Sequence, residues 1–472
     1  METTVFERQR PAAKIIEDSL AETTFGCFWI EDVESTVARY PALAGDLTAD
    51  FAVVGGGFAG LWTAIKLKEQ HPDQRVILLE GLRIGWAASG RNGGFCEASI
   101  THGEPNAASR WPDELEVLER LGYENLDAIE RFVTEHQLDV EFERTGVLSV
   151  ANEEYQLEYF EESNEHHIRL DAEQTQARIN SPTFHGAVFS PKENANVHPA
   201  KLAAELARHA ASIGVEIFED TRVTGLSGRG DDPIELQTAQ GSVWAGKVAL
   251  CTNVFPSLLK RYAFHTIPVY DYVLMTEPLT DEQLASIGWA GREGLADNAN
   301  QFHYSRLTKD NRILWGGYDA VYHTGGRIKP EYEDRMESHR KLASHFFTTF
   351  PQLAGVKFSH RWAGVIDSST RFCAFFGQAN GGRVQYVAGF TGLGVGATHF
   401  AADVIADRFA GRTTERTELQ MVKQMPLPFP PEPAAAIGVN MFRWSFDRAD
   451  HNRGKRNLFL KTMDAIGFGF DS

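Results

Sequence analysis

The sequence predicts an α/β protein in which a sheet covered by helices is built from separated stretches of chain and alternates with strands of a second sheet. Three observations support this fold class. Residues 51–81 have the order buried strand, glycine turn, helix and buried strand. The order strand, glycine turn and helix returns at residues 383–411. Between them, residues 269–279 and 312–319 have the pattern of strands of a different sheet.

Composition sets the broad class of the protein. The chain has 472 residues, of which 43% are hydrophobic, enough for a large core. Its formal charge of −18 argues against the basic face that non-specific nucleic-acid binding needs. Its apolar runs fall short of the roughly 18 to 20 residues of a membrane span, and its charged start is unlike a signal peptide. We expect a cytoplasmic protein with no nucleic-acid partner and no membrane span, and the oligomeric state stays open.

The four cysteines predict neither a metal centre nor a disulfide framework. Cys27, Cys96, Cys251 and Cys373 are far apart in the sequence and form no C-x-x-C pair. We expect reduced cysteines and no bound metal.

The first glycine turn matches the dinucleotide-binding pattern G-x-G-x-x-G. Gly55 permits the tight turn, Gly57 lets the backbone approach a pyrophosphate, and Gly60 lets helix and strand pack closely. The N-terminus of the following helix, which begins with Phe58 and Ala59, offers free N–H groups to the phosphates.

An acidic residue follows at the expected distance. Glu80 ends the second strand, where its carboxylate can accept hydrogen bonds from ribose hydroxyls. The motif does not separate NAD from FAD. However, the chain runs directly into a second glycine-rich segment, "GLRIGWAASGRNGGF", and returns to the sheet only near residues 197 and 383. A dinucleotide domain made of dispersed segments favours FAD.

The remaining chain supplies further elements. Residues 113–137 and 152–180 are helical in period, residues 199–226 read as helix, strand and strand, and "GKVALCTN" is a buried strand. A proline-rich linker at 424–434 precedes a basic, aromatic tail, which either lies on a membrane or partner or, as we favour, packs back as a helix. The predicted division is an N-terminal segment, a discontinuous FAD-binding domain, a substrate domain and a tail: 1–48; 49–110, 195–265 and 355–423; 111–194 and 266–354; 424–472.

At this point the chain resembles the FAD-dependent oxidoreductases of the D-amino acid oxidase superfamily. Five motifs carry the resemblance over residues 45–425: "VVGGGFAGLWTA" with "VILLE", "GWAASGRNGGF", "HPAKLAAELARHAASIGVEIFEDTRVTGL", "VALCTN" and "GFTGLGVGAT". The branch of γ-glutamylputrescine oxidoreductase, glycine oxidase and sarcosine oxidase looks nearest. "IPVYDYVLMTEPL" and "FHYSRLTKDNRILWGGYD" resemble segments of its putrescine-type members.

The resemblance implies a bilobal fold, with a glutathione-reductase-type FAD-binding domain and an antiparallel sheet over the substrate. FAD would lie between them, with the second glycine-rich segment along its ribityl chain and isoalloxazine. The implied cofactor residues are Gly55, Gly57, Phe58, Ala59, Gly60, Glu80, Ser89, Gly90, Arg91, Asn92, Gly93, Gly94, Val223, Thr252, Gly392, Leu393, Gly394 and Val395.

Three departures from the family pattern matter. Leu393 stands where relatives often carry histidine. Leu314 or Trp315 stands where some sarcosine oxidases place a lysine for oxygen activation. Gly90 and Ile366–Asp367 stand where relatives with covalent flavin have histidine or cysteine. The last departure implies non-covalent FAD.

Four residues are candidates for the substrate pocket: Tyr272, Tyr304, Arg306 and Trp362. The tyrosines and the tryptophan could wall the pocket or pack within the sheet. Arg306 could bind a substrate carboxylate in bidentate fashion or position its loop, the reading we favour. Arg91 could likewise face the cofactor phosphates or bridge the two lobes.

The implied reaction is oxidation of a carbon–nitrogen bond in a small amine or amino acid, such as a polyamine derivative or an N-alkyl or D-amino acid. Hydride would pass to flavin N5, water would hydrolyse the imine, and O₂ or another acceptor would reoxidise the flavin, giving H₂O₂ in the case of O₂. A flavin dehydrogenase of 2-hydroxy acids is an alternative. A non-catalytic escort protein is another, which the intact glycine turn with Glu80 argues against.

Overall fold

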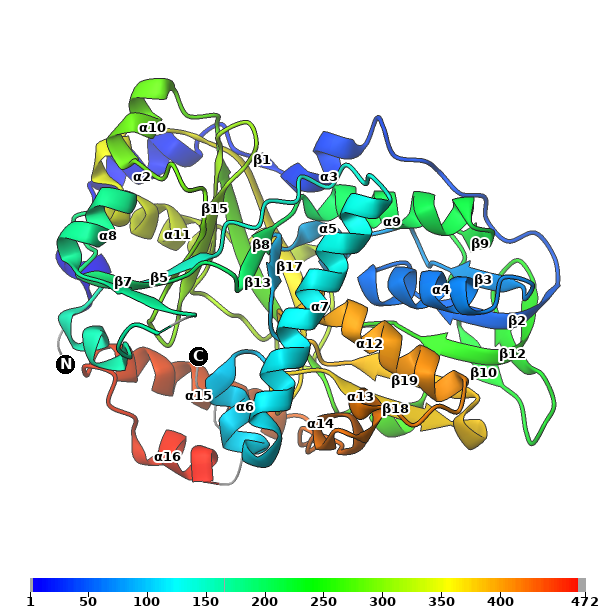
Figure 1. Ribbon diagram of the computed structural model, residues 1–472. Helices are drawn as coiled ribbons and strands as arrows, with labels where there is room; N and C mark the ends of the chain where they lie inside the picture. The colour runs from blue at the N-terminus through cyan, green and yellow to red at the C-terminus, as the bar shows by residue number, and fades with distance from the viewer. Residues whose placement is uncertain (1–2, 165, 466–472) are drawn as a thin grey trace.

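The computed structural model describes residues 3–164 and 166–465 and contains two large sheets next to each other (Figure 1). The first sheet has eight strands. Its parallel strands are β2 (Leu47–Val54), β3 (Val76–Leu79), β9 (Val215–Phe218), β12 (Ser242–Leu250) and β19 (Val384–Ala388). The antiparallel strands β10 (Gly225–Ser227), β11 (Ile234–Gln237) and β18 (Phe375–Ala379) extend it. The segments predicted to share one nucleotide-binding sheet therefore do so.

Four helices bury their apolar faces in one core with this sheet. They are α4 (Phe58–Gln70), α7 (Leu115–Glu135), α9 (Pro199–Ser212) and α12 (Gly394–Phe409). Val53 and Leu78 point into that core, whereas Val54 and Leu79 point into the core on the opposite face. Strands buried on both faces explain why β2 and β3 read as continuous apolar runs.

The second sheet has nine strands and is mostly antiparallel. In spatial order they are β1 (Thr24–Phe25), β17 (Phe358–Ser368), β13 (Ile267–Thr276), β16 (Ile313–Gly317), β15 (His303–Leu307), β14 (Gly294–Asp297), β5 (Val147–Ala151), β7 (Gly186–Ser190) and β6 (Ile168–Leu170). Helix α11 (Met336–Thr349) packs against one face of this sheet. A two-stranded ribbon of β4 (Phe95–Glu97) and β8 (Asn194–Asn196) follows the second glycine-rich segment.

Shorter elements complete the described chain. The α-helices are α1 (Val5–Arg8), α2 (Ala13–Leu20), α3 (Phe28–Val33), α5 (Ala88–Arg91), α6 (Glu104–Arg110), α8 (Ala172–Arg178), α10 (Asp281–Ile287), α13 (Glu415–Glu418), α14 (Gln420–Lys423), α15 (Ala434–Asp450) and α16 (Leu458–Ala465). The 3₁₀ helices are η1 (Pro112–Glu114), η2 (Glu154–Tyr159), η3 (Lys260–Tyr262), η4 (Pro330–Tyr332), η5 (Pro351–Leu353) and η6 (Asn380–Gly382). No helix in the described part of the chain has the length and apolar character that crossing a membrane requires.

The sequence-based elements are largely confirmed, with one clear error. Residues 199–226 form α9, β9 and β10 as predicted. Residues 152–180 do not form a continuous helix, because η2, β6 and α8 share this stretch. Helix α8 starts only at Ala172, after its N-cap Asp171, whose side chain accepts a hydrogen bond from the Gln174 N–H at 2.8 Å. The charges that imitated a helical period lie in exposed loops and short elements.

Two segments pack with the other domain than the one predicted for them. Strand β17 falls in the predicted FAD-binding segment 355–423, yet it pairs with β13 along its length in the nine-stranded sheet. Helix α7 falls in the predicted substrate segment 111–194, yet Leu118 and Leu126 share the core of α4 and α12. Tertiary packing, not position along the chain, decides both placements. The other domain boundaries stay predictions.

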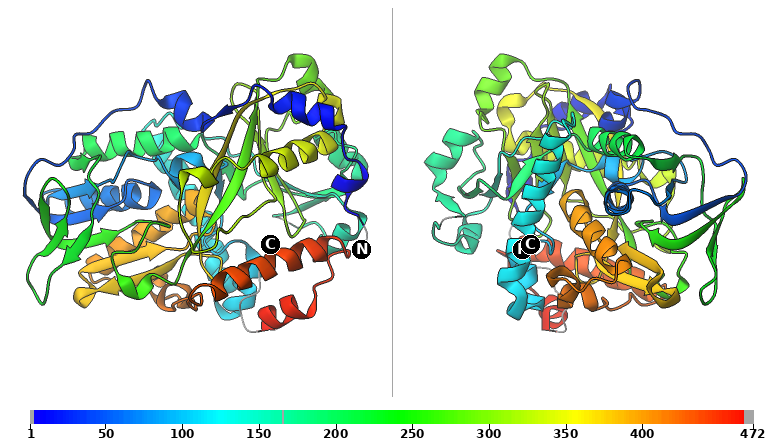
Figure 2. Two further views of the ribbon diagram at one scale, coloured as in Figure 1. Left: turned by 180° about the vertical axis from the view of Figure 1, so that it is seen from behind. Right: turned by 45° about the vertical axis from the view of Figure 1, so that its right-hand side comes forward.

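The C-terminal helix α15 packs back on the nine-stranded side, as the favoured interpretation of the tail expected (Figure 2). Arg443 on α15 forms an ion pair with Asp319, which follows β16. Asp450 accepts hydrogen bonds from the Asn300 side chain at 2.7 Å and the Asn300 N–H at 2.9 Å. His451 lies 3.1 Å from Glu7 of α1, so the end of α15 lies next to α1.

Asp319 anchors α15 through a buried carboxylate. It also pairs with Arg335 at 2.6 Å and Lys341 at 3.4 Å. Burial alone would raise the pKa of Asp319, but Lys341, Arg443 and the other partners hold it below its ordinary value. Its stabilising effect is therefore present at neutral pH and is lost as acid protonates the carboxylate.

We predict that Asp319→Asn lowers the free energy of unfolding by about 3 kcal/mol, because it leaves three cations without their shared partner. A lower urea midpoint at pH 7 would measure this. Glu124→Gln is the control, since its ion pair with Arg120 is solvent-exposed and should leave the midpoint unchanged. Equal midpoints for the two variants would contradict the anchoring role of Asp319.

Candidate flavin site

The first glycine turn has the geometry that its sequence predicted. Gly55 has φ +111°, and a Cβ there would lie 2.4 Å from the Cys251 carbonyl oxygen. Gly57 is the N-cap of α4, and a Cβ at Gly60 would lie 1.9 Å from the Gly55 oxygen. Phe58 and Ala59 are the first residues of the helix. The turn therefore places the N-terminus of α4, the positive end of the helix dipole, at the C-terminal end of β2.

Glu80 lies directly after β3 and faces this turn. Its carboxylate accepts hydrogen bonds from the Gly56 N–H at 2.6 Å, the Leu82 N–H at 2.8 Å and the Trp86 indole N–H at 2.9 Å. Burial raises its pKa above the ordinary range. Two carboxylate oxygens offer about four acceptor positions, so three bonds leave room for a ligand hydroxyl.

The second glycine-rich segment contacts the first turn directly. Its residues 88–91 form the short helix α5, and the Ser89 hydroxyl accepts a hydrogen bond from the Phe58 N–H at 3.0 Å. The Asn92 side chain donates to the Ser89 carbonyl at 2.9 Å and accepts from the Gly94 N–H at 2.8 Å. These bonds fold residues 88–94 into one compact unit against the N-terminus of α4.

The glycines of this unit are required by protein contacts. A Cβ at Gly90 would lie 2.3 Å from the Gly85 oxygen, and one at Gly93 would lie 2.7 Å from the Tyr304 ring. Gly94 has φ +78°, and its Cβ would lie 2.2 Å from the Val197 oxygen. The resemblance places this segment along the cofactor. In the structure its glycines make room for neighbouring protein atoms.

Two arginines hold the second glycine-rich segment in place. Arg91 pairs with Glu333 at 2.5 Å and donates to the Trp86 carbonyl at 2.9 Å, which matches the bridging interpretation. Arg306 is only 1% exposed and donates to the Val197 carbonyl at 2.5 Å and the Gly94 carbonyl at 3.3 Å. Burial lowers the pKa of Arg306 to about 10. These contacts tie Arg306 to the second glycine-rich segment and to the segment before α9, and its role in positioning or in substrate binding stays a prediction.

The predicted pocket residues divide between the two faces of the nine-stranded sheet. Residues paired directly across neighbouring strands point to the same face of a sheet. The pairs that run across β15, β16, β13 and β17 are Tyr304 with Gly316, Gly316 with Val273, and Val273 with Trp362. The side chains of Tyr304 and Trp362 therefore share one face. Tyr304 and Trp362 accordingly belong to one apolar cluster. Trp362 donates its indole N–H to the Arg91 carbonyl at 2.8 Å, which places this face against the second glycine-rich segment.

Tyr272 lies on the opposite face, which corrects its grouping with Tyr304 and Trp362. It packs in the core under α11 and donates its hydroxyl to the Tyr332 carbonyl at 2.8 Å. Neighbouring residues of a strand point to opposite sides, so Asp271, one residue earlier, takes the face of Tyr304 instead. The same alternation puts Leu314 on the face of Tyr304 and Trp315 in the core under α11.

Asp271 is the site residue that the sequence analysis missed. The Tyr304 hydroxyl donates a hydrogen bond to its carboxylate. Burial raises the pKa of Asp271 to about 6, although the Tyr304 bond acts in the opposite direction. An acid between two tyrosines in an otherwise apolar strand was the available signal, since a buried carboxylate is costly unless it has a role.

The third glycine turn joins β19 to α12. Asp367 accepts the Gly389 N–H at 2.5 Å, and burial raises the pKa of this carboxyl to about 7. Gly392 has φ +92° and open space around its Cβ position. Leu393 is the N-cap of α12, and Gly394 and Val395 are the first residues of the helix. The turn thus presents a second helix N-terminus.

The remaining predicted cofactor residues lie at the ends of the eight-stranded sheet. The half-buried Val223 lies in the connection between β9 and β10, and Thr252 follows β12 beside the first glycine turn. The Thr252 hydroxyl is buried and has no hydrogen-bond partner among the described residues. Such an orphaned hydroxyl, the glycine turn and the nearby Glu80 carboxylate together fit a dinucleotide.

The fold and the glycine turns define a dinucleotide-binding oxidoreductase. The chain belongs to the DAO family of FAD dependent oxidoreductases, whose model matches residues 50–408. It is 31% identical over 390 residues to "Gamma-glutamylputrescine oxidoreductase" of Escherichia coli K12, covering 79% of this chain and 86% of that one. "Probable oxidoreductase OrdL" of Haemophilus influenzae is 27% identical over 387 residues, covering 79% and 85%.

Solved structures share the fold. The crystal structure of glycine oxidase from Geobacillus kaustophilus superposes with a TM-score of 0.62 at 18% identity, covering 78% of this chain and 96% of that one. Family membership makes the protein an FAD-dependent enzyme, which confirms the cofactor that the sequence predicted.

We predict that Gly93→Val abolishes retention of FAD, because its side chain meets the Tyr304 ring and forces residues 88–94 away from α4. The visible flavin absorbance of the purified protein measures this. Gly438→Ala is the matched control, since its Cβ has no neighbour within 4 Å, and it should stay fully yellow. A folded, fully yellow Gly93→Val protein would refute the placement.

Proposed function

We propose that the protein oxidises a carbon–nitrogen bond of a small amine or amino acid that binds as its ammonium form, such as a polyamine derivative, an N-alkyl amino acid or a D-amino acid, with O₂ as the final acceptor. The observation that carries the proposal is the partly buried Asp271 carboxylate beside Tyr304, on the sheet face that meets the second glycine-rich segment. The 31% identity to γ-glutamylputrescine oxidoreductase supports an amine substrate.

The proposed role of Asp271 is to recognise the substrate amine. Among the described residues, none forms an ion pair with Asp271, so its charge is offset only by hydrogen bonds. A substrate ammonium would supply the missing cation. The ring of Tyr304, which is only partly buried, can attract the same ammonium group, whereas Trp362 is 1% exposed and packs behind it in the same apolar cluster.

The pairing also provides an acceptor for the proton of the substrate ammonium group. An ammonium group must lose its proton before the carbon next to nitrogen can be oxidised, and a carboxylate with a pKa of about 6 can take that proton at Oδ2. The Tyr304 hydroxyl donates to the same atom and keeps it oriented. The protein's net charge of −18 would also attract cationic substrates at long range.

FAD, when bound, supplies the two-electron acceptor for the substrate. The first turn and the N-terminus of α4 would hold its pyrophosphate, and Glu80 its ribose. Residues 88–94 would line the ribityl chain, and the N-terminus of α12 would face the isoalloxazine. Non-covalent binding and a cytoplasmic location remain parts of the proposal, the latter in keeping with four free, buried cysteines.

The proposal is tested by anaerobic bleaching of the flavin. Polyamine derivatives, N-methyl amino acids, D-amino acids and 2-hydroxy acids are offered as reductants, and peroxide is then measured in air. Bleaching by amines with stoichiometric peroxide is the expected result. Bleaching only by 2-hydroxy acids overturns the amine assignment, and bleaching by amines without peroxide overturns O₂ as the acceptor.

We predict that Asp271→Asn lowers kcat/KM for a cationic amine on the order of 30-fold to 100-fold above pH 7, because it removes a charge-assisted contact. In the unmodified protein kcat/KM should rise through about pH 6 as Asp271 ionises, and this inflection should disappear in the variant. The pH profile of kcat/KM measures both effects.

Stability separates this role from a structural one. The raised pKa of Asp271 means that the folded protein disfavours its ionised form, so Asp271→Asn should unfold at the same or a higher temperature at pH 8. Tyr304→Phe keeps the carboxylate and should retain the inflection, displaced to higher pH because a bond that favours the ionised form is lost. An unchanged pH profile in Asp271→Asn would contradict the proposed contact.

A further inference from the structure

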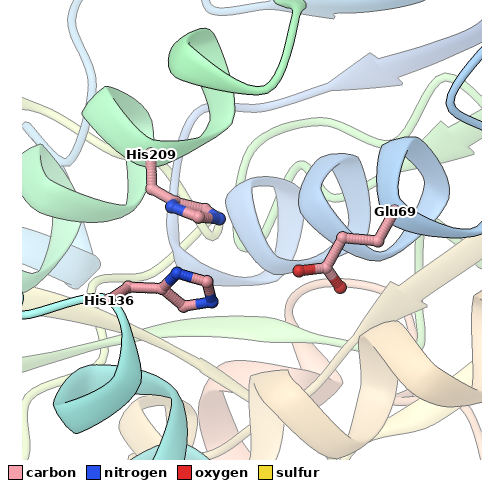
Figure 3. Close-up of side chains that lie close together, drawn as sticks. All are labelled: Glu69, His136 and His209. Atoms are coloured by element: carbon pink, nitrogen blue, oxygen red, sulfur yellow. The ribbon is translucent and has the colours of Figure 1, made fainter.

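Two histidines and a glutamate converge on the outer side of the helices that cover the eight-stranded sheet (Figure 3). Glu69 lies near the C-terminal end of α4, His136 is the C-cap of α7, and His209 lies on α9. One ligand atom of each side chain lies within 4.8 Å of those of the other two. The cluster lies at the opposite end of α4 from the first glycine turn, so the proposed reaction does not use it.

Packing brings the two histidine rings next to each other. Their ring centroids are 4.2 Å apart, and the Phe132 ring lies 4.4 Å from His136 and 5.0 Å from His209. The His136 N–H also donates to the Phe132 carbonyl at 3.1 Å, which closes the end of α7. The imidazoles are therefore held next to each other by the helix ends and an aromatic side chain, before any ligand arrives.

The buried histidine has an unsatisfied nitrogen. His209 is 8% exposed, and its Nε2 atom is buried without a hydrogen-bond partner among the described residues. A buried ring nitrogen without a partner is unfavourable, and native proteins rarely keep one without a reason. Glu69 and His136 are exposed, so a ligand can reach the cluster from solvent.

We propose that Glu69, His136 and His209 bind one divalent transition-metal ion, with Zn²⁺ as the best match. Two imidazole nitrogens and one carboxylate oxygen are a three-ligand set typical of Zn²⁺, and water completes the tetrahedron. Mg²⁺ and Ca²⁺ prefer all-oxygen sites and should bind poorly. This assignment departs from the sequence analysis, which expected no metal.

The geometry requires a small closure around the ion. Tetrahedral ligands at about 2.0 to 2.1 Å from Zn²⁺ lie about 3.3 Å from each other. The exposed Glu69 and His136 side chains can rotate inward while His209 stays in place. The positive charge of the nearby Lys66 does not oppose the ion, because Lys66 is paired with Asp403 at 3.2 Å.

A bound ion would fasten the ends of α4 and α7 to α9. Because α4 begins at the first glycine turn, this clamp would act on the helix layer that supports the FAD-binding sheet. An ion that binds only the folded protein raises the unfolding temperature, by an amount that grows with the logarithm of its concentration above the dissociation constant. The proposed role is therefore stabilisation, which can be measured without an amine substrate.

The test uses the full-length, untagged, FAD-loaded protein after removal of metals with a chelator. Equilibrium dialysis against ZnCl₂ in excess Mg²⁺ should give one tightly held zinc per chain, and saturating zinc should raise Tm by about 3 °C. Glu69→Gln and His136→Gln should each weaken zinc binding at least about tenfold and remove the Tm rise. Both positions are exposed, so the variants should fold.

His185→Gln is the control, because this exposed histidine lies outside the cluster and should leave zinc binding unchanged. Absence of stoichiometric zinc, or unchanged binding in Glu69→Gln and His136→Gln, would overturn the proposal. Zinc binding that His185→Gln weakens equally would overturn it as well, since that result indicates scattered surface histidines.

Discussion

The simultaneous contact of residues 88–94 with both sheets is the constraint on which the site depends. On one side the Ser89 hydroxyl binds the Phe58 N–H at the start of α4. On the other side Gly93 packs against the Tyr304 ring, and the Gly94 carbonyl accepts a hydrogen bond from Arg306. A single short segment thus sets the spacing between the N-terminus of α4 and the nine-stranded sheet.

Buried charge concentrates at this junction. Glu80, Asp271, Arg306 and Asp367 are all largely removed from water, and each is held by hydrogen bonds to turns or neighbouring side chains. The cost of burying them is offset only while those turns keep their shape. The carboxyls of Asp271 and Asp367 have pKa values of about 6 and 7, so their charge is easily changed. Such groups are common where a protein binds and transfers protons.

The parts of the site that the sequence predicted are those whose signal is local. The glycine turn with Gly55 and Gly57 needs only neighbouring residues to specify it, and Glu80 follows at a fixed distance. The partners of Arg306 and the contact behind Gly93 come from segments about a hundred residues or more away, so the sequence did not show them. The proposed zinc site of Glu69, His136 and His209 could not be predicted from the sequence for the same reason, because the three helices that carry it meet only in the folded chain.

Strand parity explains the misplaced Tyr272 and the missed Asp271 together. Along β13, Tyr270, Tyr272 and Leu274 enter the core under α11, while Val273 and Met275 enter the cluster with Trp362. The sequence "YDYVLM" does not tell which alternate residues point toward Tyr304 and which point toward α11, because the residues on both faces of the strand are largely apolar. Asp271 is the one residue that breaks this symmetry. A carboxylate is tolerated far better beside the Tyr304 hydroxyl than in the apolar core under α11, so Asp271 distinguishes the face of β13 that lies toward Tyr304 from the face that lies under α11.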